Sequence, residues 1–408
     1  MKFWKILAST VLCLGLVLLV LPGKAEAVVV DSGTCGDNLT WTLDATGTLT
    51  VSGIGPMDDY LPGSLPWRDL SASIKCVVIS SGVTTVGGYA FYYCQRLHTV
   101  ELPNSLTQIG PYAFSCCSAL TDITIPNSVT VISGAAFDCC TSLVEVEIPD
   151  GVTSLGGYVF SNCHQLTRAR LPDGLTSIGD YLFYSCGSLT EVNIPTNVTD
   201  IGDNAFLWCK SLQEIAIPEK VKSIGKNAFN GCEALTKVMI PDGVVTVNNA
   251  AFAYCDSLTE VTLGKGIKTI SGDVFRSCSA LKTVTLSDSL KIVMDDAFYG
   301  CDDLAHVYYA GTRAQWGEIA ILDGNECLTN ARVYILGEQL PGDIDGGGDV
   351  TTDDAVYLLL SVMFGTKDYP VADGVKLDFN DDGKVDTDDA VYLLLHVMFG
   401  EEDYPLTA

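Results

Sequence analysis

Basic side chains are scarce in this sequence of 408 residues. Lys and Arg number 23 against 50 Asp and Glu, which gives a formal net charge of −27. The deficit argues against nucleic acid as a partner, because a phosphate backbone is bound by clustered Lys and Arg. It argues equally against electrostatic attachment to anionic lipids. Histidine occurs only four times, and the sequence carries no Ser/His/Asp signature of the kind that nucleophilic hydrolases use.

Long apolar runs are missing after the first 21 residues. Lys2 and Lys5 precede the one such run, Ile6 to Leu21, which is 16 residues long. A transmembrane helix needs ~20 apolar residues, and the small-x-small sequence at residues 25–27 is what a signal peptidase recognises. We therefore predict a signal peptide over residues 1–27 and a secreted, extracellular chain with no membrane span after cleavage. An uncleaved anchor is the alternative.

Cysteine, in contrast, is abundant, with 16 residues. Hydrophobic residues make up 48% of the chain, so it can bury a core, and its length suggests two or three domains. So many cysteines indicate either a disulfide framework or one structural position repeated many times. Their spacing decides between these two interpretations.

A period of 23 residues runs through the middle of the chain. Phenylalanine recurs ten times at this interval from Phe91 to Phe298, and a cysteine follows each one three positions later, from Cys94 to Cys301. Leucine, proline and an aliphatic residue recur with the same period. A fixed period of 20–29 residues is typical of a solenoid, in which each coil buries its apolar face against its neighbours.

One coil illustrates the local structure that the pattern predicts. Val192 and Ile194 alternate with polar residues, as in a half-buried strand that ends at the following proline. A second extended piece contains Ile201. Phe206 and Cys209 are three residues apart, so we expect them to share one face of a short helical turn.

The repeating unit L-x-x-V/I-x-I/L-P-x-x-V-x-x-I-G-x-x-A-F-x-x-C resembles the BspA-like leucine-rich repeat over about residues 74–309. The resemblance implies a leucine-rich-repeat solenoid of short parallel β-strands and short helical turns, with about 11 coils. The strand column can be followed from Val77 to Val307, which predicts eleven strands. At ~4.8 Å between neighbouring strands, the stack would be roughly 50 Å long.

The cysteine column has three interpretations. We favour a column of small buried thiols, because free cysteine packs as a compact hydrophobe. Disulfides between coils are disfavoured, because parallel side chains do not converge. Zinc is the weakest interpretation, because no second ligand recurs with the column. We call the ten cysteines of this column the cysteine ladder. The sequence does not determine their redox state, nor that of Cys35, Cys76 and Cys327, which lie outside the ladder. Cys116 and Cys139 each stand directly before a ladder cysteine.

Both ends of the solenoid carry other elements. Residues 28–73 lack the repeat, and residues 39–51 read as a β-hairpin around a turn that contains glycine. We predict that this segment is a β cap over the first coil; a ligand-binding module that uses Trp41 and Trp67 is the alternative. Residues 310–336 are predicted to be a C-terminal cap with one helix and a last strand, and residues 337–342 a linker.

The last domain, residues 343–408, contains a second repeat with an offset of 35 residues. In its second copy, oxygen-bearing side chains stand at loop positions 1, 3, 5, 9 and 12, with glycine at position 6, and a helix follows. This is the pattern of an EF-hand calcium loop, in which a hard cation takes many oxygen ligands, among them the backbone carbonyl of position 7. The ligand positions of this copy are Asp378, Asn380, Asp382, Lys384, Asp386 and Asp389.

The two copies together closely resemble the type I dockerin domain. The resemblance implies a small all-α domain of two EF-hand-like loop–helix repeats, with two Ca²⁺ ions, that binds a cohesin module of a scaffoldin. The ligand positions of the first copy are Asp343, Asp345, Asp349, Thr351 and Asp354. Gly347 replaces the ligand at position 5, so we predict a weaker first site.

In the dockerin family, specificity lies at loop positions 10 and 11 and on the following helix. The matching positions are Thr352, Asp353, Leu359, Leu360 and Phe364 in the first copy, and Thr387, Asp388, Leu394, Leu395 and Phe399 in the second. The helix members are apolar, so the contact with cohesin should be hydrophobic. Near-identical copies also imply a quasi-two-fold surface that could dock in either orientation.

The function predicted from these features is a secreted, non-catalytic binding component of a cellulosome-like complex that degrades plant polysaccharide. The exposed strand positions of the repeats are mostly polar, without an aromatic stripe, which favours a protein partner over a glycan on this surface. A glycoside hydrolase is one alternative, although it needs two carboxylates in a cleft. A structural spacer or surface adhesin is the other.

Overall fold

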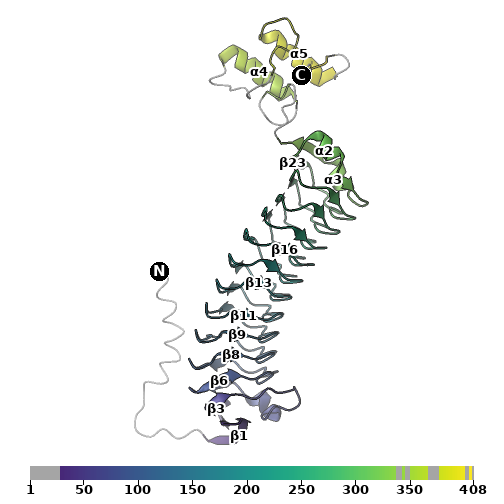
Figure 1. Ribbon diagram of the computed structural model, residues 1–408. Coiled ribbons are helices and arrows are strands. Elements are labelled where there is room, and N and C mark those ends of the chain that lie inside the picture. The colour runs from purple at the N-terminus through teal and green to yellow at the C-terminus, as the bar shows by residue number, and fades with distance from the viewer. Residues whose placement is uncertain (1–27, 337–341, 345–349, 366–375, 400–403, 407–408) are drawn as a thin grey trace.

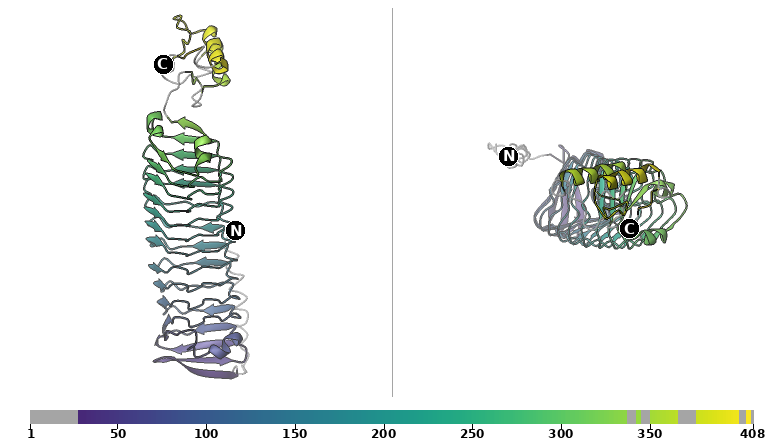
Figure 2. Two further views of the ribbon diagram at one scale, coloured as in Figure 1. Left: turned by 90° about the vertical axis from the view of Figure 1, so that its right-hand side faces the viewer. Right: turned by 90° about the horizontal axis from the view of Figure 1, so that it is seen from above.

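The computed structural model describes residues 28–336, 342–344, 350–365, 376–399 and 404–406. The predicted signal peptide, most of the predicted linker, and Asp345, Gly347 and Asp349 lie outside the described residues. Within them, the repeats form a parallel-strand β-solenoid of about eleven coils, seen from the side in Figure 1 and in two further views in Figure 2. No helix in the described ranges is both long and apolar enough to cross a membrane.

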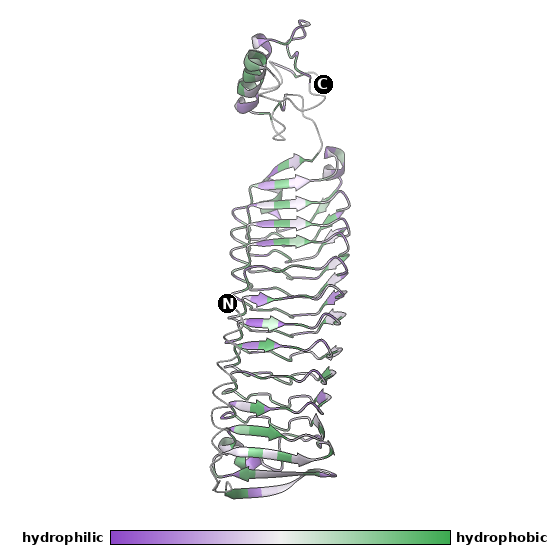
Figure 3. Ribbon diagram, turned by 90° about the vertical axis from the view of Figure 1, so that its left-hand side faces the viewer, coloured by the Kyte–Doolittle hydropathy of each residue, from purple (hydrophilic) through white to green (hydrophobic). Residues whose placement is uncertain are grey.

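One face of the stack is built from three sheets. In chain order its strands are β1 (Val29–Gly36), β2 (Leu39–Asp44), β3 (Thr48–Gly53), β5 (Cys76–Ile79), β7 (Thr99–Glu101), β10 (Glu145–Glu147), β12 (Arg168–Arg170), β14 (Glu191–Val192), β17 (Lys237–Ile240), β19 (Glu260–Leu263), β21 (Thr283–Leu286), β23 (His306–Tyr309) and β25 (Arg332–Ile335). From β3 onward neighbouring strands pair in parallel. Polar and apolar bands alternate along these strands (Figure 3), which is the period of two that buries one side of a strand.

The opposite face carries shorter strands, also paired in parallel. They are β4 (Gly55–Pro56), β6 (Val83–Val86), β8 (Gln108–Ile109), β9 (Val131–Ile132), β11 (Ser154–Leu155), β13 (Ser177–Ile178), β15 (Asp200–Ile201), β16 (Ser223–Ile224), β18 (Thr246–Val247), β20 (Thr269–Ile270), β22 (Ile292–Val293) and β24 (Ala320–Ile321). The register shifts by 23 residues per coil, as in Ser177 opposite Asp200, so every column of the sequence becomes a column in space.

Two of the eleven predicted strands, those around Ile123 and Ile215, are not hydrogen-bonded strands in the structure. The chain there still follows the solenoid, since Ile123 remains buried and Ile215 packs against the core. Side-chain burial positions these two segments without the ladder hydrogen bonds, which a pattern of apolar residues alone does not specify.

The ten phenylalanines form one continuous stack along the core. All ten side chains are fully buried. Neighbouring ring centroids lie 5.1–5.9 Å apart in near-parallel pairs. Trp67 continues the column before Phe91, with a centroid distance of 5.4 Å. The repeat therefore places each ring against its copies in the coils before and after.

The turn around each phenylalanine alternates between right- and left-handed backbone. The residues two positions before and two positions after every phenylalanine have positive φ, for example Tyr158 and Asn162 around Phe160. The Phe160 amide donates to the carbonyl of Leu182 in the next coil, and the Cys163 amide donates to the carbonyl of Phe160. Hydrogen bonds to the neighbouring coil thus select a tighter turn than the helical one that the spacing alone predicts.

The ladder cysteines are free, buried thiols, as the favoured interpretation predicts. Each thiol from Cys117 to Cys301 also donates to the carbonyl of the phenylalanine 26 residues earlier, at sulfur–oxygen distances of 3.0–3.4 Å. These nine bonds were not predicted from the sequence. They tie each coil to the previous one, because the accepting carbonyl belongs to the neighbouring turn.

The N-terminal segment covers the first coil. The predicted hairpin is the antiparallel pair β2–β3, with β1 added on its outer side and a 3₁₀ helix at Arg68–Ser73. Trp41 and Trp67 are buried and lie edge to face with centroids 5.6 Å apart, and Trp67 Nε1 donates to the Ala90 carbonyl at 2.7 Å. Both tryptophans therefore serve the core, and the alternative of a ligand-binding module that uses them is wrong.

The C-terminal end of the stack has the predicted helix and last strand. Helix α2 (Arg313–Gly317) begins at a capping box formed by Thr312 and Gln315, and β25 extends the sheet beside β23. The structure adds β24 and a short helix, α3 (Glu326–Asn330). Asn325 before α3 is buried and donates to the carbonyls of Met294 and Leu322, so it fastens this segment onto the last coils.

Candidate functional site

The two C-terminal helices, α4 (Thr352–Phe364) and α5 (Thr387–Phe399), pack on each other around a small core of their own. This core consists of three pairs of residues, each related by the 35-residue offset: Ile344 and Phe379, Ala355 and Ala390, and Leu358 and Leu393. The internal repeat of the sequence is therefore a repeat in structure. Each copy contributes the same positions to the shared core, as a quasi-two-fold arrangement requires.

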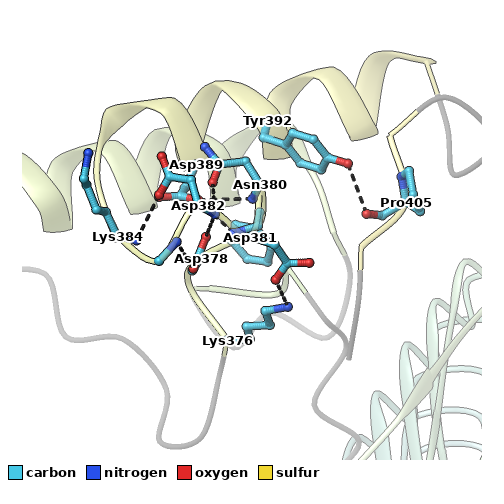
Figure 4. Close-up of polar contacts among 11 residues, drawn as sticks. Lys376, Asp378, Asn380, Asp381, Asp382, Lys384, Asp389, Tyr392 and Pro405 are labelled. Carbon is cyan, nitrogen blue, oxygen red and sulfur yellow. Dashed lines mark hydrogen bonds and ion pairs between the residues drawn. The ribbon is translucent and has the colours of Figure 1, made fainter.

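The second loop brings its acidic side chains onto its own backbone amides (Figure 4). Asp378 accepts from the amides of Asp382 and Gly383 at 3.1 and 2.9 Å. Asn380 Oδ1 accepts from the same Asp382 amide at 3.0 Å, and Asp382 Oδ1 accepts from the Lys384 amide at 2.9 Å. Gly383 has a φ of 84°, the left-handed conformation for which an EF-hand loop uses glycine at this position.

The aspartate at position 12 plays the same part in both loops. Asp389 is fully buried and accepts from the amides of Phe379 and Asp386, both at 2.8 Å. Asp354 is 1% exposed and accepts from the amides of Ile344 and Thr351 at 2.8 and 2.7 Å. Each carboxylate thus joins the start of its loop to the start of its helix. These charge-assisted hydrogen bonds from backbone amides fix the conformation of the loop.

The donor set of the second loop suits a hard cation. Asp378, Asn380, Asp382 and Asp389 present only oxygen ligands within one twelve-residue loop, as calcium prefers. In the first loop Asp343 and Asp354 are buried, while Asp345 and Asp349 lie outside the described residues. Among the residues that are described, no group of three or more His, Cys, Asp or Glu side chains is arranged to hold a metal ion. The oxygen-bearing side chains of these loops fit calcium, and we take up calcium binding as a proposal below.

The predicted docking positions fall into two groups. Phe364 and Phe399 are 60% and 57% exposed. The loop residues Thr352, Asp353, Thr387 and Asp388 are exposed as well. In contrast, the four leucines are only half-exposed, and two of them pack against the helix-pair core. The four are Leu359, Leu360, Leu394 and Leu395, of which Leu359 and Leu394 touch that core.

Sequence reasoning missed four exposed apolar side chains on the same helices. Val356 and Met363 on α4 are 53% and 60% exposed, and their counterparts Val391 and Met398 are 52% and 61% exposed. The spacing of seven residues places Val356 and Met363 on one side of α4. A helical-wheel comparison with the buried Ala355 and Leu358 could have found this pair, because those residues mark the inner side.

The exposed strand positions of the repeats are mostly polar, with Met239 on β17 an exception, and are partly paired between coils. Arg168 lies 3.3 Å from Glu191, Arg170 lies 3.0 Å from Asp150, and the Lys237 ammonium lies 2.6 Å from Glu260. These pairs are solvent-exposed, so each contributes little to stability, about 0–1 kcal/mol. They leave a surface of mixed charge on the strand face.

Comparison with protein-family models matches residues 70–188 and 176–305 to the BspA type leucine rich repeat region. The match ends before the C-terminal helix pair. No curated protein matches the chain.

Similar solved structures are themselves repeat proteins. A leucine-rich repeat protein from Eubacterium ventriosum is 23% identical, with 68% of this chain and 84% of that chain covered and a TM-score of 0.49. A leucine rich cell surface protein from Faecalibacterium prausnitzii is 27% identical, with 73% and 99% covered and a TM-score of 0.41. A leucine-rich repeat protein from Bacteroides ovatus is 23% identical, with 71% and 98% covered and a TM-score of 0.39.

The family match covers more than half of the chain. It falls on the same residues whose 23-residue period becomes the phenylalanine stack and the thiol ladder of the solenoid. The chain therefore belongs to the BspA-type leucine-rich repeat family.

Proposed function

We propose that the protein is a secreted, non-catalytic binding protein of a cellulosome-like complex, in which residues 343–408 act as a dockerin. One observation carries the proposal: two loop–helix copies, 35 residues apart, pack around one common core. Each copy also has a buried aspartate that closes its loop and a set of exposed apolar side chains on its helix. A calcium-stabilised pair of loops that presents two equivalent helices is suited to bind a cohesin module. The repeat stack then displays a second binding surface.

Calcium would act on the shape of the loops. Asp378, Asn380, Asp382 and Asp389 would hold the ion in the second copy, and Asp343 and Asp354 belong to the corresponding set in the first. A bound ion supplies positive charge among carboxylates that otherwise repel each other. The loops lead directly into α4 and α5, so we expect their order to fix the two helices relative to each other.

The proposed docking surface is apolar. It consists of Val356, Met363 and Phe364 on α4 with Val391, Met398 and Phe399 on α5. Burial of apolar area contributes ~25 cal/mol per Å², so these side chains are the main source of affinity that the helices offer. We expect the exposed Thr and Asp residues at loop positions 10 and 11 to select among cohesins by hydrogen bonds at the rim.

Binding of the whole protein to a panel of immobilised type I cohesin modules tests this function. We expect at least one module to bind in calcium and to release the protein when a chelator is added. Thr352→Ala with Asp353→Ala should leave affinity nearly unchanged, because the second copy can dock instead. The same two changes combined with Thr387→Ala and Asp388→Ala should reduce affinity at least tenfold.

Two results would contradict the proposal. Failure to bind any module in calcium, or binding that is indifferent to the chelator, would remove the dockerin function. A large loss from the first-copy changes alone would refute docking in two orientations while leaving the dockerin function intact. A matched variant at the repeats, Glu101→Ala, changes an exposed strand residue and should bind cohesin like the unmodified protein.

For the repeat stack, we propose that the strand face binds a protein partner. Its exposed residues are mixed in charge and linked by ion pairs between coils. Such surfaces give specificity through complementary charge rather than through a buried apolar patch.

A further inference from the structure

Exposed aromatic side chains gather on the turn edge of the stack, which we define as the segments that flank the buried phenylalanines. In the sequence these aromatic residues recur in only some of the coils, so they do not form a continuous column like that of the phenylalanines. In the structure Tyr158 stacks on Tyr181 with ring centroids 4.3 Å apart, and Tyr184 lies 5.4 Å from Trp208. The row of rings therefore crosses several coils.

The row leads into a cavity of about 730 Å³ between Trp208 and Tyr254. Trp208, Gly231 and Tyr254 hold the same position in three successive coils, two residues after the phenylalanine. The two rings are 46% and 48% exposed. Two coils of a parallel stack span ~9.5 Å, so an extended ligand can meet both rings along the stack axis.

Gly231 keeps the space between the two rings open. A Cβ atom at this position would lie 2.6 Å from Trp208 Cδ1, and Gly231 has a φ of +70°. Any side chain here would displace the indole ring. The glycine thus lets the Trp208 ring lie across the coil and leaves the cavity beside it.

The remaining lining residues of the cavity are mostly polar. Asn230 Nδ2 donates to Asn227 Oδ1 at 3.2 Å, and Lys210 pairs with Glu233 at 2.8 Å. Asp256 adds a second carboxylate. The lining carries more negative than positive charge, in a chain of net charge −27, and this disfavours an acidic ligand.

We propose that the Trp208 pocket, lined by Trp208, Tyr254, Gly231, Asn227, Asn230 and Glu233, binds a neutral polysaccharide chain. The apolar C–H face of a pyranose ring packs on an aromatic ring, and its hydroxyls both donate and accept hydrogen bonds. Asparagine amides and carboxylates offer the matching partners. The spacing of two coils, ~9.5 Å, suits the first and third of three successive sugars in an extended chain. This inference does not rest on the docking function of the C-terminal helices.

Affinity electrophoresis of the whole protein tests the pocket. The gels contain soluble mixed-linkage β-glucan, xyloglucan or hydroxyethylcellulose, with the acidic polysaccharide polygalacturonate as a counter-probe. We expect at least one neutral polysaccharide to retard the protein and polygalacturonate to have no effect. Trp208→Asn should weaken the retardation at least tenfold. Asparagine already occupies this position of the coil at Asn162 with positive φ, so the backbone conformation is tolerated.

The matched control is Tyr93→Asn, because Tyr93 is exposed, has positive φ and stands at the same position of another coil. It should bind like the unmodified protein. Tryptophan fluorescence gives a second readout, since among the described tryptophans Trp41 and Trp67 are buried and Trp316 is partly buried, while Trp208 is exposed. The active polysaccharide should protect Trp208 from a soluble quencher. If none of the neutral polysaccharides retarded the protein, the proposal would be overturned and a protein would remain as the partner of this edge. An equal loss of retardation in Trp208→Asn and Tyr93→Asn would also overturn it.

Discussion

Raising the pH from 8 to about 10 is expected to unfold the repeat stack. Burial raises the pKa of Cys94 to about 12, and it raises the pKa of the other nine ladder thiols as well. An unfolded thiol has a pKa near 9. The stability that the protonated thiols contribute is therefore complete below about pH 9 and is lost as the pH rises toward the folded-state pKa.

The expected loss is large because the ten thiols act together. Each thiol lowers the free energy of unfolding by about 1.4 kcal/mol per pH unit once it is ionised in the unfolded chain and still protonated in the folded chain. Ten thiols would together lose on the order of 10 kcal/mol between pH 9 and 10, because an unfolded thiol is only half ionised at pH 9. This loss is comparable to the whole stability of a typical domain, about 5–15 kcal/mol. Circular dichroism under reducing conditions, with denaturant titrations at each pH, measures this slope.

A variant with Cys163→Ala, Cys186→Ala and Cys209→Ala is the control. It removes three of the ten ladder thiols and keeps every tyrosine. It also keeps Cys35 and Cys139, whose pKa values are likewise raised by burial, so the slope of the unfolding free energy against pH should fall by about a quarter. Its lower stability at pH 8 does not affect this comparison. An unfolding free energy that is flat from pH 9 to 10, or a slope that is the same in both proteins, would show that the ladder thiols are not what titrates.

Asp389→Ala is expected to unfold the C-terminal helix pair in the absence of calcium and to prevent its rescue by calcium. The buried carboxylate accepts from the amides of Phe379 and Asp386. Hydrogen bonds to a charged group contribute about 1.5–3 kcal/mol each, and two are lost together with a proposed calcium ligand. Hydrogen exchange of the α4 and α5 amides in the whole protein, with calcium and with a chelator, measures the effect.

Asp381→Asn is the matched control for this change. Asp381 belongs to the same loop but is exposed, and its carboxylate lies 2.7 Å from the Lys376 ammonium. Such surface pairs contribute about 0–1 kcal/mol, and asparagine tolerates the positive φ of this position. Protection of α4 and α5 should match that of the unmodified protein. If Asp389→Ala kept full protection, the carboxylate would not hold the loop to its helix.

The sequence predicted the columns of the solenoid better than its turns. The 23-residue spacing of Phe160 and Cys163 with their copies determines that they stack, because every coil adds the same residues at the same height. The spacing of three is equally compatible with a helical turn. The alternating turn follows from hydrogen bonds to the next coil, such as that between Phe160 and Leu182, and these bonds exist only once the coils are stacked.

The residues of the candidate sites were also predicted only in part. Loop positions such as Asp389 were predicted from spacing alone, because one short loop contains most of the ligands. The exposed Val356 and Met363 were missed, since apolar residues on a helix are normally assigned to a core. The Trp208 pocket was missed because an aromatic residue stands at this position in only three of the ten coils, and a site made from the differences between coils leaves no continuous period in the sequence.

The measurement that tests the central claim most directly is a calorimetric calcium titration of the whole protein. A dockerin with these loops should bind two Ca²⁺ ions, one tightly and one more weakly, because Gly347 lacks the ligand at position 5 of the first loop. Gly347→Asp should then tighten the weaker site toward the affinity of the other. Absence of calcium binding, or two equally tight sites in the unmodified protein, would contradict this account of residues 343–408.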